Sequence, residues 1–118
     1  MTTTLSTIRF EPGAVVRTNI RFTGGGAIKR RPVVVLTDDR YHNSRADAIV
    51  LALTGSVHIA YHGDCDIQDW QVAGLAKESK AKGVLQTIDR ASVDYQYGHL
   101  SPADLDRVKD SLRLILNV

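Results

Sequence analysis

The residues best suited to bind a ligand lie in a glycine-rich loop that leads into three consecutive cations. The segment Phe22–Leu36 reads FTGGGAIKRRPVVVL. Glycine lets backbone N–H groups come close to a ligand, and Pro32 favours extended backbone at Arg31. We interpret the segment as a basic loop that closes on a polyanion, with Arg31 fixed at the start of a strand. A polar hairpin loop with solvated charges is the alternative interpretation.

Cations are concentrated in the first third of the chain. Residues 1–36 hold six lysines and arginines and one acid, Glu11, which gives a net charge of +5. Residues 37–118 hold nine cations and twelve acids, a net charge of −3, so that the whole chain carries +2. This asymmetry is typical of a site for a polyanion such as nucleic acid. Solvated cations on the face of a strand would give the same count.

The sequence offers little to hold a metal ion or a cofactor, and we expect neither. His58 and His62 are four residues apart without a third ligand, and Cys65 is the single cysteine. No apolar run approaches the roughly 20 residues of a membrane helix, and the N-terminus lacks the regions of a secretory signal. We therefore expect a cytoplasmic protein with no cofactor and no membrane contact.

Apolar and alternating stretches predict a mainly β domain. The chain has 118 residues, of which 43% are hydrophobic and 24% charged, as in a globular protein with one modest core. We expect residues 1–10 to be a flexible leader and residues 11–118 to form a single domain. The residue pattern predicts strands at 15–22, 33–37, 48–54, 57–61 and 84–89, with a short extended segment at 93–98. Polar stretches predict loops at 23–30, 38–47 and 63–69.

The C-terminal segment predicts an amphipathic helix. Ser101 stands at the N-cap, Pro102 at the first helical position and Asp104 in the first turn. Apolar residues then follow at helical spacing on one face: Leu105, Val108, Leu112, Ile115 and Leu116. Many short strands followed by one helix indicate a small, strongly curved β-barrel with the helix packed on its sheet.

Short segments spread in order along the chain resemble the PemK/MazF-type toxins of bacterial type II toxin–antitoxin systems. The similarity runs from Glu11 to about Leu116, and the basic loop is its most recognisable part. The segments that carry it are Glu11–Val16, Phe22–Leu36, Asp39–Asn43, Ile49–Thr54, Trp70–Leu75, Thr87–Arg90 and Gly98–Ser101. The resemblance implies a mainly β, SH3-like barrel with a C-terminal helix that forms a homodimer.

The resemblance also implies an activity and partners. It implies a metal-independent endoribonuclease that cleaves single-stranded RNA through attack by the RNA's own 2′-OH. The products of such a reaction are a 2′,3′-cyclic phosphate and a free 5′-OH. A cognate antitoxin with an acidic C-terminal segment is the implied protein partner, and DNA binding is implied through the antitoxin complex.

The residues of the site follow from the same resemblance. Arg31 matches the family's catalytic arginine before proline, and Thr54 matches its catalytic threonine. A guanidinium stays protonated at neutral pH and can donate two parallel hydrogen bonds to phosphate oxygens. The Thr54 hydroxyl can bond the phosphate or orient the 2′-OH. The residues expected to bind RNA are Phe22, Thr23, Gly24, Lys29, Arg30, Ser56 and Lys82.

Three positions depart from the family pattern. Gly55 stands where many relatives carry serine, with Ser56 as the nearest hydroxyl to replace it. Lys82 and Gln86 stand where arginine is common. Glycine has no side chain to bond a phosphate, and lysine lacks the bidentate geometry of arginine. Two alternatives therefore stay open: a non-catalytic SH3-like module that binds nucleic acid or protein, and a gyrase-inhibiting toxin of the same fold.

Overall fold

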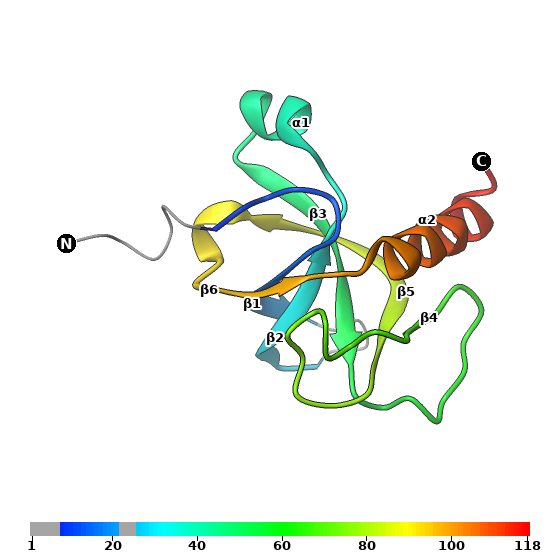
Figure 1. The fold of residues 1–118 in the computed structure, drawn as a ribbon. Helices are drawn as coiled ribbons and strands as arrows, with labels where there is room; N and C mark the ends of the chain where they lie inside the picture. The colour runs from blue at the N-terminus through cyan, green and yellow to red at the C-terminus, as the bar shows by residue number, and fades with distance from the viewer. Residues whose placement is uncertain (1–7, 22–25) are drawn as a thin grey trace.

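A curled antiparallel sheet with helices at its margins forms the described part of the chain, which is residues 8–21 and 26–118 of a computed structural model (Figure 1). The elements in chain order are β1 (Ala14–Arg21), β2 (Ile28–Val35), α1 (Asp39–Ser44), β3 (Asp47–Thr54), β4 (Cys65–Ile67), β5 (Ser79–Asp89), the 3₁₀ helix η2 (Arg90–Ser92), β6 (Tyr95–His99) and α2 (Pro102–Leu116). Among these elements, no helix has the length and apolar character to cross a membrane.

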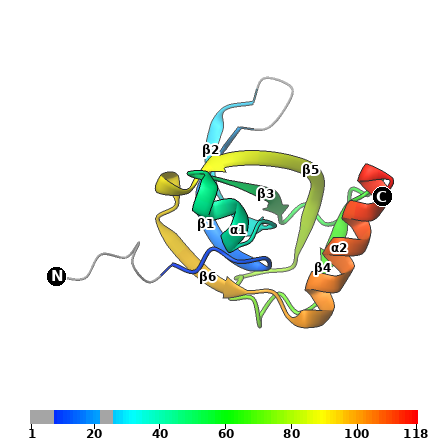
Figure 2. The same cartoon turned by 90° about the horizontal axis from the view of Figure 1, so that it is seen from above.

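The strands form one sheet in the order β4-β5-β3-β2-β1-β6, and each neighbouring pair is antiparallel. Seen from above, the sheet wraps around itself, with α2 beside β4 and β5 (Figure 2). The mainly β fold with a strongly curved sheet and a C-terminal helix is as the sequence predicts.

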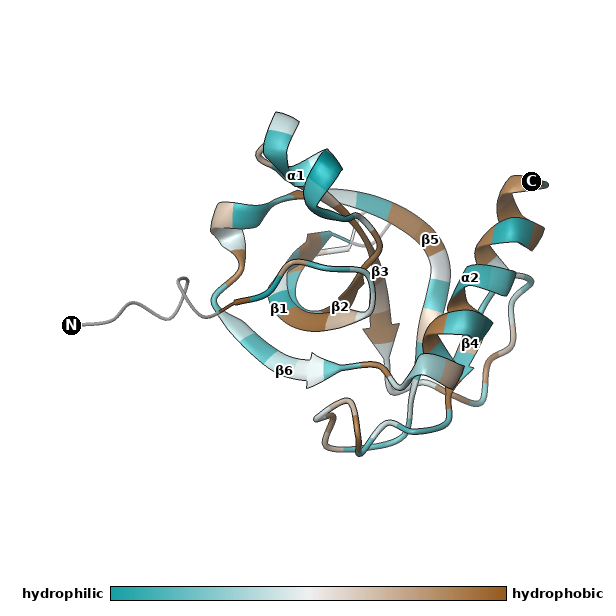
Figure 3. Ribbon diagram, turned by 45° about the horizontal axis from the view of Figure 1, so that its top comes forward, coloured by the Kyte–Doolittle hydropathy of each residue, from teal (hydrophilic) through white to brown (hydrophobic). Residues whose placement is uncertain are grey.

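Both faces of the curled sheet are buried, which explains the continuous apolar runs of the central strands. In β2, Val33 and Val35 belong to one core cluster, whereas Val34 between them belongs to the other. Alternate residues of a strand point to opposite faces, so each face needs its own apolar set. Figure 3 shows the resulting hydrophobic stretches in β2 and β3. The second cluster packs against α2 through Val108, which is fully buried.

Helix α2 begins as the sequence predicts, and its residue Asp104 also binds backbone groups outside the helix. The Ser101 side chain caps the helix by accepting the N–H of Asp104 at 3.2 Å, and Pro102 follows as the first helical residue. Asp104 itself is fully buried, and its carboxylate accepts the backbone N–H groups of Gln68 (3.0 Å) and Asp69 (2.8 Å). This carboxylate therefore ties the start of α2 to the turn after β4.

Two polar stretches that predicted loops contain regular structure. Residues 39–44 form α1, whose N-cap Asp38 accepts the N–H of Arg40 at 3.1 Å. A helix of six residues is too short to show a helical period in the sequence. Residues 65–67 form β4, because this short segment pairs with the outer edge of β5. Both predictions of a loop are wrong.

The strand limits differ from prediction where polar residues take part in the sheet. No strand forms at residues 57–61, where Ile59 and Tyr61 are exposed. Strand β2 begins at Ile28 because pairing with β1 extends the hairpin beyond the apolar run. Strand β5 begins at Ser79, five residues early, and holds Lys80 buried with its Nζ 3.2 Å from Asp64 Oδ2.

Candidate active site

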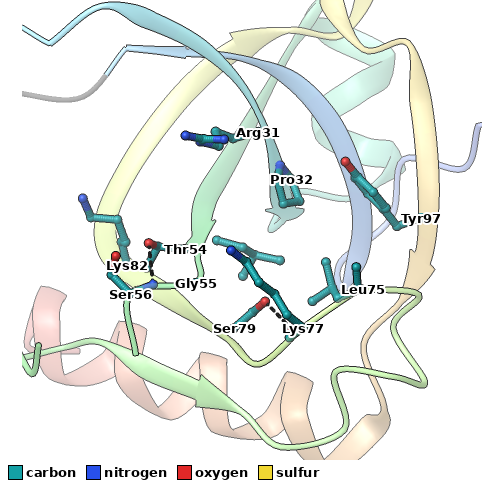
Figure 4. Close-up of a pocket in the computed structure, with 12 residues that line it drawn as sticks. Arg31, Pro32, Thr54, Gly55, Ser56, Leu75, Lys77, Ser79, Lys82 and Tyr97 are labelled. Carbon is teal, nitrogen blue, oxygen red and sulfur yellow. Dashed lines mark hydrogen bonds between the residues drawn. The ribbon is translucent and has the colours of Figure 1, made fainter. Parts of the chain in front are cut away.

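A pocket of about 540 Å³ lies where β2, the end of β3, the start of β5 and β6 meet (Figure 4). Its lining residues come from five separate segments of the chain. They are Arg31, Pro32, Leu53, Thr54, Gly55, Ser56, Leu75, Ala76, Lys77, Ser79, Lys82 and Tyr97. Within residues 8–21 and 26–118, three lining residues are cations and none is acidic, so the pocket is suited to an anion.

Arg31 and Arg30 are neighbours on β2 but have different surroundings. Successive residues of a strand point to opposite faces. Arg31 lines the pocket and forms no ion pair with any acid in the described part of the chain. Arg30 instead has its Nη1 2.7 Å from Asp94 Oδ2, and Arg17 Nε lies 3.0 Å from the other oxygen. These two cations lower the pKa of Asp94 below its usual range, Arg17 having the larger effect. The guanidinium of Arg31 is thus left to bind a ligand.

Thr54 ends β3 at the edge of the pocket. Its Oγ1 accepts the backbone N–H of Ser56 at 3.1 Å, which fixes the hydroxyl at the mouth of the turn. A hydroxyl that accepts one hydrogen bond still has its proton to donate. Thr54 can therefore donate to a phosphate oxygen or to the 2′-oxygen of a ribose placed in the pocket. Ser56 lines the pocket beside it and is exposed.

Lys82 reaches the pocket from an irregular part of β5. Leu51 of β3 pairs with Leu85, and Leu53 pairs with Ala81, so β5 has extra residues opposite Ala52. Such a bulge bends a strand and redirects its side chains, and bulges are common beside active sites. Here the bulge contains Lys82, which lines the pocket as a third cation beside Arg31.

Lys77 is a lining residue that the sequence did not single out. It lies in the segment between the turn at residues 68–74 and β5, and its amine end points into the pocket in Figure 4. The sequence showed it only as one lysine in the lysine-rich stretch 77–83. Tyr97 of β6, also unpredicted, lines another side and packs edge-on against Tyr95, with the ring centres 5.0 Å apart.

The structure brings four of the predicted site residues into one pocket: Arg31, Thr54, Ser56 and Lys82. Lys29 and Arg30 are exposed on the same strand as Arg31 but do not line the pocket. The predicted residues Phe22, Thr23 and Gly24 lie outside the described residues. Gln86 pairs with Val50 in the sheet and does not line the pocket.

The family of the chain follows from a comparison with protein-family models. The model of the PemK-like, MazF-like toxin of type II toxin–antitoxin systems matches residues 11–116. The chain therefore belongs to this family of toxins, and the resemblance seen in the sequence is confirmed. A comparison with curated proteins found no match.

Solved structures of such toxins share the fold at low sequence identity. The Mycobacterium tuberculosis toxin MazF-mt6 superposes with a TM-score of 0.72 at 18% identity, over 89% of this chain and 97% of that one. MazF from Deinococcus radiodurans gives a TM-score of 0.72 at 19% identity, over 92% and 96%. A mycobacterial endoribonuclease in complex with its cognate antitoxin gives 0.69 at 15% identity, over 95% and 96%.

Proposed function

We propose that this toxin is a metal-independent endoribonuclease that cleaves single-stranded RNA in the cytoplasm. The observation that carries the proposal is one pocket bordered by the Arg31 guanidinium, the Thr54 hydroxyl and two lysines, with no acid among the described residues that line it. The fixed cations supply the positive charge that a phosphodiester and its transition state require. Membership of the toxin family supports the same activity.

The reaction we infer breaks the P–O5′ bond and forms a bond from the ribose O2′ to the same phosphorus. Arg31 donates paired hydrogen bonds to two non-bridging oxygens, and this interaction strengthens as negative charge grows on the phosphorane. Thr54 donates to the phosphate or holds the 2′-OH in line with the leaving oxygen. The 2′ proton leaves to solvent or to the phosphate, and the departing 5′-oxygen takes up a proton from solvent. Groups of this kind contribute about 10²–10⁴-fold, which fits a slow nuclease.

A single-stranded substrate suits the surroundings of the pocket. Sequence-specific recognition of RNA relies on unstacked bases that lie against aromatic rings or guanidinium planes. Tyr97 offers an aromatic surface in the lining, and its edge-on contact with Tyr95 holds the ring in place. Exposed Lys29 and Arg30 extend the positive surface along β2 and would attract the flanking backbone.

Incubation of purified protein with a long RNA in EDTA tests the proposal directly. Primer extension should show discrete stops, and the fragments should carry 5′-OH ends and 2′,3′-cyclic phosphates. Activity that disappears with EDTA and returns with Mg²⁺ would contradict the mechanism. RNA binding without cleavage would instead favour the non-catalytic binding module.

A homodimer and an antitoxin complete the proposal. Leu114, Leu116 and Val118 are exposed at the end of α2, and symmetric pairing of two chains is the commonest way to cover such a surface. The double variant Leu114→Glu/Leu116→Glu should then be a monomer in light scattering at micromolar concentration. The control variant Lys109→Glu on the same helix should remain a dimer. Dimeric Leu114→Glu/Leu116→Glu would exclude this surface. The antitoxin is expected to bind through an acidic C-terminal segment.

A further inference from the structure

The end of the Lys77 side chain fills the space that a side chain at position 55 would occupy. A Cβ atom placed on Gly55 would lie 2.5 Å from Cε of Lys77, 2.8 Å from its Nζ and 3.4 Å from its Cδ. Carbon atoms that are not bonded to each other essentially never approach this closely, so a side chain at position 55 requires the end of the Lys77 side chain to move. The two residues lie in loops that are more than twenty positions apart in the sequence.

The backbone conformation does not explain the glycine. Gly13, Gly63 and Gly74 are the described glycines with positive φ, and Gly55 is not among them. Any residue could adopt its backbone conformation, so no turn geometry requires glycine here. What distinguishes Gly55 is the lysine packed against it.

The backbone of Lys77 is held in place by the neighbouring residues, whereas its side chain is exposed. Leu75 and Ser79 on either side are buried, each with 8% of its surface exposed. The Ser79 hydroxyl donates a hydrogen bond to the backbone carbonyl of Lys77 at 2.9 Å (Figure 4). The Lys77 ammonium has no carboxylate partner within the described part of the chain. The segment thus presents an uncompensated charge to the cavity that Arg31 and Thr54 border.

We propose that Lys77 is a further phosphate-binding residue of this site, and that Gly55 provides the space for it. The inference rests on the proposed function, because it requires an RNA phosphodiester in the pocket. An ammonium is a compact charge with three donors. Placed beside the reacting phosphate, it donates to a non-bridging oxygen in addition to the donors of Arg31, and its attraction grows as the phosphorane gains charge. The cation takes the role that a hydroxyl at position 55 would otherwise fill.

The competing explanation is that the methylene groups of Lys77 only cover the floor of the pocket. Lys77→Met keeps most of that apolar contact and removes the charge, and Lys77→Arg keeps the charge in a different shape. Lys109→Met on the exposed side of α2 is the matched control. Thermal unfolding and circular dichroism should confirm that all four proteins are folded.

The first measurement is single-turnover cleavage of an oligonucleotide that contains a site mapped with the wild-type protein. Lys77→Met should cleave about 100-fold more slowly, at the lower end of what is expected for removal of one donor to a developing oxyanion. Lys109→Met should match the wild type. A rate for Lys77→Met within twofold of the wild type would overturn the inference.

A double-mutant cycle tests the steric relation between the two residues. Gly55→Ser in the wild-type background should displace the ammonium and lower the rate. In Lys77→Ala the ammonium is already absent, so adding Gly55→Ser should cost little or restore part of the rate through the new hydroxyl. Such non-additivity is expected of residues in contact. Losses that multiply independently would contradict the shared space.

Failure of the proposed function gives a different result from failure of this inference. Wild-type protein that cleaves no RNA refutes the nuclease, and the binding of an all-2′-deoxy oligonucleotide then tests Lys77. Weaker binding by Lys77→Met than by Lys109→Met would retain Lys77 as a phosphate ligand. Equal binding, or no binding by any of the proteins, would reject it.

Discussion

The backbone N–H of Ser56 donates a hydrogen bond of 3.1 Å to Oγ1 of Thr54, so the turn after β3 holds the hydroxyl of the residue that ends that strand. With its oxygen engaged as an acceptor, the hydroxyl still has its proton to donate to a ligand in the pocket. The relationship links a backbone turn to the orientation of the group that we assign to catalysis.

Substitutions at Thr54 should separate the hydroxyl from the methyl group. Thr54→Val keeps the shape of the side chain but loses the hydroxyl, and its cleavage rate should fall about 100-fold, within the range of single general-acid or oxyanion contacts. Thr54→Ser keeps the acceptor for Ser56 and should retain a rate within about tenfold of the wild type. Single-turnover cleavage measures both. A Thr54→Val rate close to that of the wild type would remove the hydroxyl from the site. A loss in Thr54→Ser as large as that in Thr54→Val would show that the methyl group matters as much as the hydroxyl.

Arg31 should be sensitive even to a change that keeps its charge. Arg31→Ala should abolish detectable cleavage while the protein stays folded, and Arg31→Lys should recover little, because lysine cannot make two parallel hydrogen bonds to one phosphate. Arg113→Ala, which removes an exposed arginine paired with Asp110 on α2, is the matched control. Full activity in Arg31→Ala would remove this residue from the site.

Much of the fold and the centre of the site could be predicted from the sequence. The alternation of β1, the apolar run of β3 and the capped start of α2 are local signals that the structure confirms. Thr54 ends the apolar run of β3, and Arg31 comes just before the apolar run of β2. The sequence therefore placed both residues at strands. Both residues border the same pocket because β2 and β3 pair in antiparallel orientation. This pairing places the start of β2 beside the end of β3.

What the sequence could not provide is contact between distant loops. Lys77 is one of several lysines in its stretch, and only the packing of its loop against the turn after β3 brings it over Gly55. Likewise, the different surroundings of Arg30 and Arg31 depend on where Asp94 lies, near the start of β6. Short elements such as α1 and β4 escape detection because their stability comes from tertiary contacts rather than from a local pattern.

The free energy of unfolding should decrease as the pH falls below the ordinary pKa of histidine. His42 is buried, with 8% of its surface exposed and its Nε2 2.8 Å from Thr37 Oγ1. Burial first, and then the charge of Arg90, lower the pKa of His42 from its ordinary value of 6.5. The unfolded chain therefore takes up a proton at higher pH than the folded chain does. The free energy of unfolding should fall as the pH drops from about 6.5, by ~1.4 kcal/mol for each unit of pKa depression.

Urea unfolding at pH 7.5, 6.0 and 5.0 measures this effect. His42→Gln, which keeps a polar group toward Thr37, should show a smaller loss of stability on acidification than the wild type. His62→Gln, at an exposed position, should behave like the wild type. If His42→Gln lost as much stability as the wild type over this range, another group would be responsible.

RNA and antitoxin should compete for the cations of β2 but differ in their response to salt. RNA binding by phosphate contacts releases counterions, so the logarithm of its affinity should fall steeply and linearly with the logarithm of salt concentration. Lys29 is exposed on β2, and Lys29→Gln should reduce this slope by about 1. Lys109→Gln should leave the slope unchanged.

An antitoxin segment that folds on binding buries apolar side chains as well as pairing its acids with the same cations, so its affinity should fall less with salt. Titrations of each ligand from 50 to 300 mM KCl, followed by displacement of RNA with the antitoxin segment, decide the matter. An antitoxin complex as salt-sensitive as the RNA complex would exclude the apolar component, and simultaneous binding of both ligands would exclude a shared surface.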